Sequence, residues 1–135
     1  MNVPTSVPSS RVETLNSAPV DASGAYILVW MVASRRVRWS IQLQHARDRA
    51  SELGVPLLVL ECLRIDYPWA SPRMHGFILD GMRDNASDLE RQGVAYYPYV
   101  EPTAGAGRGL VERLARHASL VVTDYKPGFF QGRMQ

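Results

Sequence analysis

The feature that most constrains the fold is an alternation between apolar, β-rich runs and segments with helical periodicity. Residues 25–32 read AYILVWMV, and similar runs lie at 56–63, 94–100 and 119–125. Uninterrupted apolar runs are typical of strands that are covered on both faces of a parallel sheet. Their alternation with helices predicts an α/β fold with a doubly wound, Rossmann-like parallel sheet.

Three helices are predicted between these runs. The first covers 39–53 and is followed by Gly54, a residue favoured just after a helix. The second begins after Ser71, an N-cap residue with proline behind it, and ends at Gly93. Its apolar residues form one stripe made of Met74, Phe77, Ile78, Met82, Ala86 and Leu89. The third helix is marked by Leu110, Val111, Leu114, Ala115 and Ala118.

Right-handed crossovers through these helices predict about four strands in the order 3-2-1-4. Pro98 lies within the third run, and it places that strand at a sheet edge, where a missing N–H group does no harm. The last run is followed by only ten residues, 126–135, with no further helical pattern. We therefore expect the chain to be a fragment of a longer protein.

The composition is that of one domain preceded by an arm. The 135 residues are 46% hydrophobic and 21% charged, which is ordinary for a single globular domain. Residues 1–24 are rich in proline and serine and predict an extended or disordered arm, and residues 25–135 predict the α/β domain. A net charge of +2 favours no class of charged partner.

The chain contains no segment that reads as a signal peptide or a membrane span. Its single cysteine, Cys62, lies inside an apolar run, which indicates a small hydrophobic residue in a reducing compartment. We expect a cytoplasmic protein without a membrane partner.

No self-contained catalytic set is present, because the sequence has no nucleophile elbow, no Cys–His signature and no P-loop. His45, His75 and His117 are too widely spaced to indicate a metal site, and none is predicted. The glycine-rich stretch 103–110 reads TAGAGRGL. It has the spacing GxGxG rather than GxGxxG and follows the third strand, so a mobile loop is favoured over a phosphate site.

The stretch 34–39, SRRVRW, follows the first strand at the carboxyl end of the sheet, where open α/β sheets bind ligands. The topology places it beside the end of the fourth strand. We expect a candidate anion crevice at Met31, Ser34, Arg35, Thr123 and Asp124. Equally, Arg35, Arg36 and Arg38 could be solvated or paired with acids on a neighbouring domain.

Together, several stretches resemble the N-terminal α/β domain of the photolyase and cryptochrome family, and they are most similar to class II-like DNA photolyases. They are LVWM followed by ASRRVRW, then ELGVPLLVL, RMHGFILDGM, GVAYYPYVEP and LVVTDY. The resemblance extends from Arg11 to about Met134. It implies a five-stranded domain that is truncated here before its fifth strand and before the helical domain that binds FAD.

The resemblance implies a parent protein that uses light and FAD to repair pyrimidine dimers in DNA. We expect the fragment alone to be inactive, to hold no cofactor firmly and to meet damaged DNA only through the parent. The crevice is a candidate for an antenna chromophore of unknown type. The implied partner is the helical domain, and the expected docking residues are Arg36, Arg38, Arg64, Asp66, Tyr67 and Trp69.

Two alternatives remain at this point. One is a stand-alone nucleotide-binding protein with the architecture of universal stress proteins, and it would need a phosphate loop better than TAGAGRG. The other is a non-enzymatic interaction domain that docks through its aromatic residues.

Overall fold

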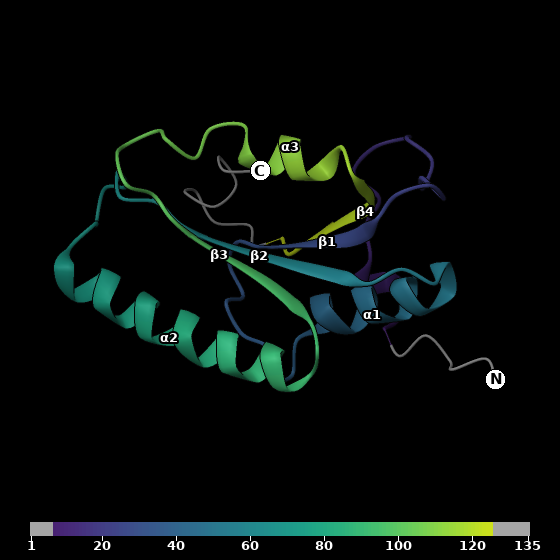
Figure 1. Ribbon diagram of the computed structural model, residues 1–135, viewed down its shortest axis with the longest axis horizontal. Helices are drawn as coiled ribbons and strands as arrows, with labels where there is room; N and C mark the ends of the chain where they lie inside the picture. Colours follow the sequence, from purple (N-terminus) through teal and green to yellow (C-terminus); the bar gives the residue numbers. More distant parts are fainter. Residues whose placement is uncertain (1–6, 126–135) are drawn as a thin grey trace.

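Four apolar segments form one sheet in which every neighbouring pair of strands is parallel. The computed structural model describes residues 7–125, so the start of the predicted arm and the end of the predicted domain lie outside the described residues. The strand order is β3-β2-β1-β4, which confirms the predicted order (Figure 1). The strands are β1 (Tyr26–Met31), β2 (Leu57–Leu63), β3 (Ala95–Val100) and β4 (Ala118–Thr123).

Helix α1 (Ile41–Leu53) begins two residues later than its pattern predicted. The hydroxyl group of Ser40 accepts a hydrogen bond from the Leu43 N–H group and so caps the helix at this point. Gly54 follows the last turn with a φ of 68°, the left-handed conformation that glycine adopts most easily. The expected end of the helix is therefore confirmed.

Helix α2 (Pro72–Arg91) has the predicted start, because the Ser71 hydroxyl group accepts from the Met74 N–H group and Pro72 is the first helical residue. Its predicted apolar stripe is only partly correct. Leu89 is completely buried, whereas Phe77 is 78% exposed. The cause is length: 20 helical residues span about 30 Å, but the 7 residues of β2 span only about 23 Å. The first turns of α2 therefore project beyond the strands (Figure 1).

The helices cover both faces of the sheet, with α1 and α2 on one side and the short α3 (Leu110–Ala115) on the other (Figure 1). Ala118, which was assigned to the third helix, is instead the first residue of β4. The core under α1 and α2 is the larger, and it includes Ile27, Val29, Met31, Leu43, Ala46, Val59 and Leu89. The opposite core is built on Leu28, Leu60 and Ala118.

The segment before β1 is mostly exposed, with one 3-10 turn, η1 (Ser9–Arg11). Its last residues are bound to the beginning of β4. The N–H group of Asp21 donates to the carbonyl oxygen of Ser119 at 3.0 Å. Gly24 lies so close to the same strand that an added Cβ would be 2.2 Å from the Ser119 backbone nitrogen. This end of the predicted arm is thus a fixed part of the fold.

Candidate functional site

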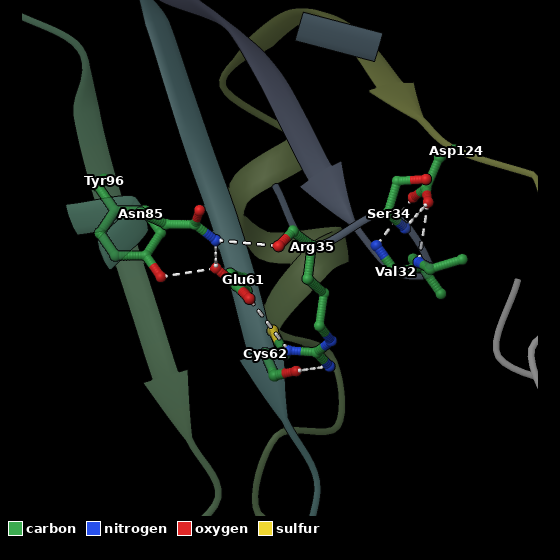
Figure 2. Close-up of polar contacts among 9 residues, drawn as sticks. Val32, Ser34, Arg35, Glu61, Cys62, Asn85, Tyr96 and Asp124 are labelled. Atoms are coloured by element: carbon green, nitrogen blue, oxygen red, sulfur yellow. Dashed lines mark hydrogen bonds and ion pairs between the residues drawn. The ribbon is translucent and has the colours of Figure 1, made fainter. Parts of the chain in front are cut away.

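A buried carboxylate lies at the centre of the polar groups near the carboxyl end of the sheet. Glu61 on β2 is 1% exposed and faces the side covered by α1 and α2. The hydroxyl group of Tyr96 on β3 donates to its Oε2 atom at 2.7 Å, and the amide nitrogen of Asn85 on α2 donates to the same atom at 2.9 Å. The guanidinium group of Arg35 lies 3.4 Å from Oε1 (Figure 2).

This cluster fixes the loop between β1 and α1. Arg35 also donates to the carbonyl oxygen of Cys62 at 2.5 Å, and Asn85 donates to the carbonyl oxygen of Arg35 at 3.4 Å. A buried carboxylate is tolerated only when it is paired and hydrogen-bonded. The pairing of Glu61 therefore holds the loop, α2 and β3 against β2.

Two neighbours of Glu61 are kept protonated by their surroundings. Burial, and then the hydrogen bond to Glu61, raises the pKa of the Tyr96 hydroxyl group above its usual value. Burial raises the pKa of the Cys62 thiol to about 11, so the thiolate that a nucleophile requires is scarce at neutral pH. Cys62 is thus a packing residue, as its position in the sequence suggested.

A second carboxylate closes the crevice between the carboxyl ends of β1 and β4. The side chain of Asp124 accepts hydrogen bonds from the N–H groups of Val32 and Ala33, each at 2.9 Å, and from that of Ser34 (Figure 2). On the same edge, the Gln42 amide nitrogen donates to the carbonyl oxygens of Trp30 at 2.8 Å and Val122 at 3.3 Å. These contacts join β1 and β4 at their carboxyl ends, where the loops that follow the two strands diverge.

The structure brings only some of the expected crevice residues together. Ser34 and Asp124 meet directly, and the Thr123 hydroxyl group donates to the carbonyl oxygen of Trp30 nearby. Met31 is 1% exposed and belongs to the core, while Arg35 turns away toward β2. The N–H groups that suit an anion are already bonded to Asp124. A bound anion would have to displace that carboxylate.

The expected docking residues form two separate groups. Arg38 makes two hydrogen bonds to Asp88 on α2, at 3.0 and 3.2 Å, and this contact lowers the pKa of Asp88. Arg64 instead pairs with Asp66 in its own loop at 2.8 Å. Their loops therefore face different neighbours.

The other docking candidates differ in exposure. Arg36 is exposed beside a cleft that it lines together with α2. Trp69 is 69% exposed, and the Tyr67 ring lies 5.5 Å from the ring of His75. The large exposed aromatic surface of this group is thus on the loop after β2.

The glycine-rich loop folds onto the protein's own side chains. The N–H group of Gly107 donates to Glu101 Oε1 at 3.3 Å, and an added Cβ at Gly107 would lie 3.0 Å from the Tyr99 ring. The second oxygen of Glu101 accepts from the Ile65 N–H group at 3.2 Å. A carboxylate therefore occupies a position that a phosphate cradle would leave open, which weighs against nucleotide binding here.

The sequence patterns did not indicate that Glu61, Asn85, Tyr96 and Gln42 belong to this region. The one available signal was the glutamate itself, since an acid inside the run LLVLECL is unusual and implies buried partners. Within residues 7–125 there is no cluster of three or more histidine, cysteine or acidic side chains arranged to hold a metal. Helices long and apolar enough to cross a membrane are likewise absent from that part of the chain.

Comparison with known proteins adds one observation. No family model matches the chain. It is 36% identical over 86 residues to a deoxyribodipyrimidine photo-lyase from Methanothermobacter thermautotrophicus. This match supports a relation to the photolyase family. The aligned residues cover 64% of this chain but only 19% of that photo-lyase, so the chain spans about a fifth of its relative.

Proposed function

We propose that the chain is the antenna-side α/β domain of a photolyase-like flavoprotein. In this proposal the whole protein uses light and FAD, held by a helical domain, to repair pyrimidine dimers in DNA. The observation that carries the proposal is the 36% identity to a deoxyribodipyrimidine photo-lyase. The parallel sheet in the order β3-β2-β1-β4 agrees with the α/β domain that the sequence resemblance implies.

The role proposed for this domain is to dock the helical domain through the loop after β2. Trp69 exposes most of its surface there and follows the Arg64–Asp66 pair in the same loop. A large aromatic side chain within a polar rim is typical of a protein interface. Arg36 and Arg38, in the loop after β1, are proposed as a second, outer contact with the helical domain, separate from the loop after β2.

An antenna chromophore would add light absorption, but the crevice residues do not fit one in this conformation. The N–H groups of Val32, Ala33 and Ser34 are bonded to Asp124, and the Arg35 side chain is bonded to Glu61 and Cys62. No free set of donors remains among these residues. We therefore assign no chromophore to the crevice of this chain, and docking is the better supported role.

The test is a chimera in which this chain replaces the aligned segment of the Methanothermobacter photo-lyase. Trp69→Ala should lower the temperature of flavin release by the equivalent of roughly 2 kcal/mol, as for a buried aromatic hot spot. Arg36→Ala should cost less, because a rim charge contributes little.

Trp39→Ala is the comparison, since Trp39 is a second tryptophan, 92% exposed, in the loop of Arg36 and Arg38. It should cost less than Trp69→Ala, because this loop is proposed only as the outer contact. Flavin release and secondary structure are followed separately. If Trp69→Ala leaves flavin release unchanged while Arg36→Ala abolishes light-driven repair, these loops belong to an anion or DNA-backbone site and the docking role is wrong.

A further inference from the structure

Glu101 is a further buried carboxylate, and it lies where two loops leave the sheet. It follows β3 directly and is 5% exposed. Its N–H group donates to the carbonyl oxygen of Leu63 at 3.0 Å, so its backbone extends the pairing of β3 with β2. The loops that follow these two strands begin at the same end of the sheet (Figure 1). Glu101 is therefore fixed at the point where both loops start.

The two oxygen atoms of this carboxylate bind the two loops separately. Oε2 accepts from the N–H group of Ile65, in the loop after β2, at 3.2 Å. Oε1 accepts from the N–H group of Gly107, in the glycine-rich loop before α3, at 3.3 Å. A buried carboxylate needs such donors, and hydrogen bonds to a charged acceptor are stronger than those between neutral groups. Glu101 thus links two loops that are far apart in the sequence.

The contact with Ile65 holds the loop that carries Trp69. Ile65 lies between Arg64 and Asp66, whose side chains pair with each other at 2.8 Å. That pair stays within the loop, whereas the hydrogen bond to Glu101 joins the loop to β3 and so to the sheet. Glu101 thus fixes the first part of the loop that exposes Trp69.

The glycine-rich loop packs closely against the same side chain. An added Cβ at Gly107 would lie 3.0 Å from the Tyr99 ring and 3.7 Å from Oε1 of Glu101. A larger side chain at this position would therefore push the loop away from β3. The loop has its own internal turn, in which the Ala106 N–H group donates to the carbonyl oxygen of Thr103 at 3.0 Å. The position of this loop and that of the Glu101 carboxylate are thus linked.

We propose that Glu101 is a positioning residue for the docking of the helical domain. Its carboxylate locks the loop after β2 to the glycine-rich loop, and the locked arrangement presents Trp69 to the partner. A loop that is already ordered loses less conformational freedom on binding, so it docks more tightly. This inference rests on the proposed docking function, but the lock between the loops can be tested without it.

Fluorine NMR of the full chain labelled with 5-fluorotryptophan tests the lock. The three tryptophans give separate signals, which variants with one tryptophan replaced by phenylalanine assign. Glu101→Gln keeps the size of the side chain but leaves one acceptor oxygen, so one of the two N–H groups loses its partner. It should move the Trp69 signal and leave that of Trp39, in the loop after β1, in place. Glu90→Gln, an exposed position on α2, is the matched control and should move neither.

Gly107→Val tests the same link from the other loop. It changes no docking residue, but it should move the Trp69 signal because the displaced loop pulls on Glu101. Ala106→Ser, at the exposed neighbouring position, is its control. Circular dichroism checks that each variant is folded. An unmoved Trp69 signal in either folded variant would overturn the proposal, and so would equal movement of the Trp69 and Trp39 signals.

The chimera with the Methanothermobacter photo-lyase separates the lock from docking. Glu101→Gln should lower the temperature of flavin release, and it should add little to Trp69→Ala because it acts through the same side chain. Fully additive effects would overturn the positioning role. If Glu101→Gln moves the Trp69 signal but neither substitution changes flavin release, the lock is confirmed and the proposed docking function is wrong.

Discussion

At the scale of single residues, the fold depends on a carboxylate in a place where a carboxylate is costly. Glu61 lies between apolar neighbours on the central strand β2, and three partners on three other segments satisfy it. Removing one member of a buried, paired set leaves the others unsatisfied. We therefore expect the loss of one member to lower the free energy of unfolding by more than its own contact contributes, because its partners are left unsatisfied.

Substitutions within the cluster test this expectation by urea unfolding. Glu61→Ala should lower the free energy of unfolding by about 3 kcal/mol, because Arg35, Asn85 and Tyr96 lose their acceptor. Tyr96→Phe should cost about 1.5 kcal/mol or more, the value for a hydrogen bond to a charged group. The control is Glu52→Ala, on the surface of α1. Equal costs for Glu61→Ala and Glu52→Ala would show that the cluster is not stabilising.

The contact between Arg38 and Asp88 should make stability depend on pH. The hydrogen bond from Arg38 lowers the Asp88 pKa in the folded state below its usual value of 3.8. The contribution is therefore present above the unfolded pKa and is lost as pH falls through the folded pKa.

Arg38→Gln should lower the melting temperature at about pH 7 and have a smaller effect at about pH 3, where protonation weakens the pair in both proteins. High salt should reduce the difference at neutral pH, since the Arg38 side of the pair is exposed. An effect of the same size at both pH values would contradict this assignment.

At the scale of elements, local signals predicted where helices and strands begin and end. Gly54 and Ser71 fulfil the capping roles that their positions indicated, and Pro98 lies on the edge strand. The cap at Ser40 was not anticipated, because the helix was expected to begin at Trp39. The stripe on α2 was predicted less well. Periodicity identifies apolar residues, but it does not reveal that a helix is longer than the sheet below it, so Phe77 was expected to be buried.

Two glycines give a matched test of how closely the elements pack. Gly24→Ala should destabilise the fold by about 1–3 kcal/mol through overpacking, because its Cβ would lie 2.2 Å from the Ser119 backbone. Gly76→Ala should stabilise it by about 0.5–1 kcal/mol, since α2 has open space there and alanine favours a helix. Thermal unfolding measures both. A neutral Gly24→Ala variant would show that the segment before β1 is not fixed to β4.

At the scale of the whole molecule, the strand order followed from the alternation of elements and the right-handed crossover rule. The candidate site was harder to predict. The sequence placed Ser34 and Asp124 at the same edge of the sheet, but it could not show that the Asp124 carboxylate binds the backbone of the loop. It also could not show that Arg35 turns inward to Glu61. Both depend on long-range pairing, which periodicity does not record.

We propose that the chain is a docking domain that does not itself bind a nucleotide or a flavin. Equilibrium dialysis of the full chain against FAD and against ATP tests it most directly. We expect no saturable binding of either compound at concentrations up to about 1 mM. A dissociation constant of about 1 mM corresponds to a binding free energy of only about 4 kcal/mol. Saturable binding of either compound with one molecule per chain would contradict the claim. The crevice or the glycine-rich loop would then be the candidate ligand site.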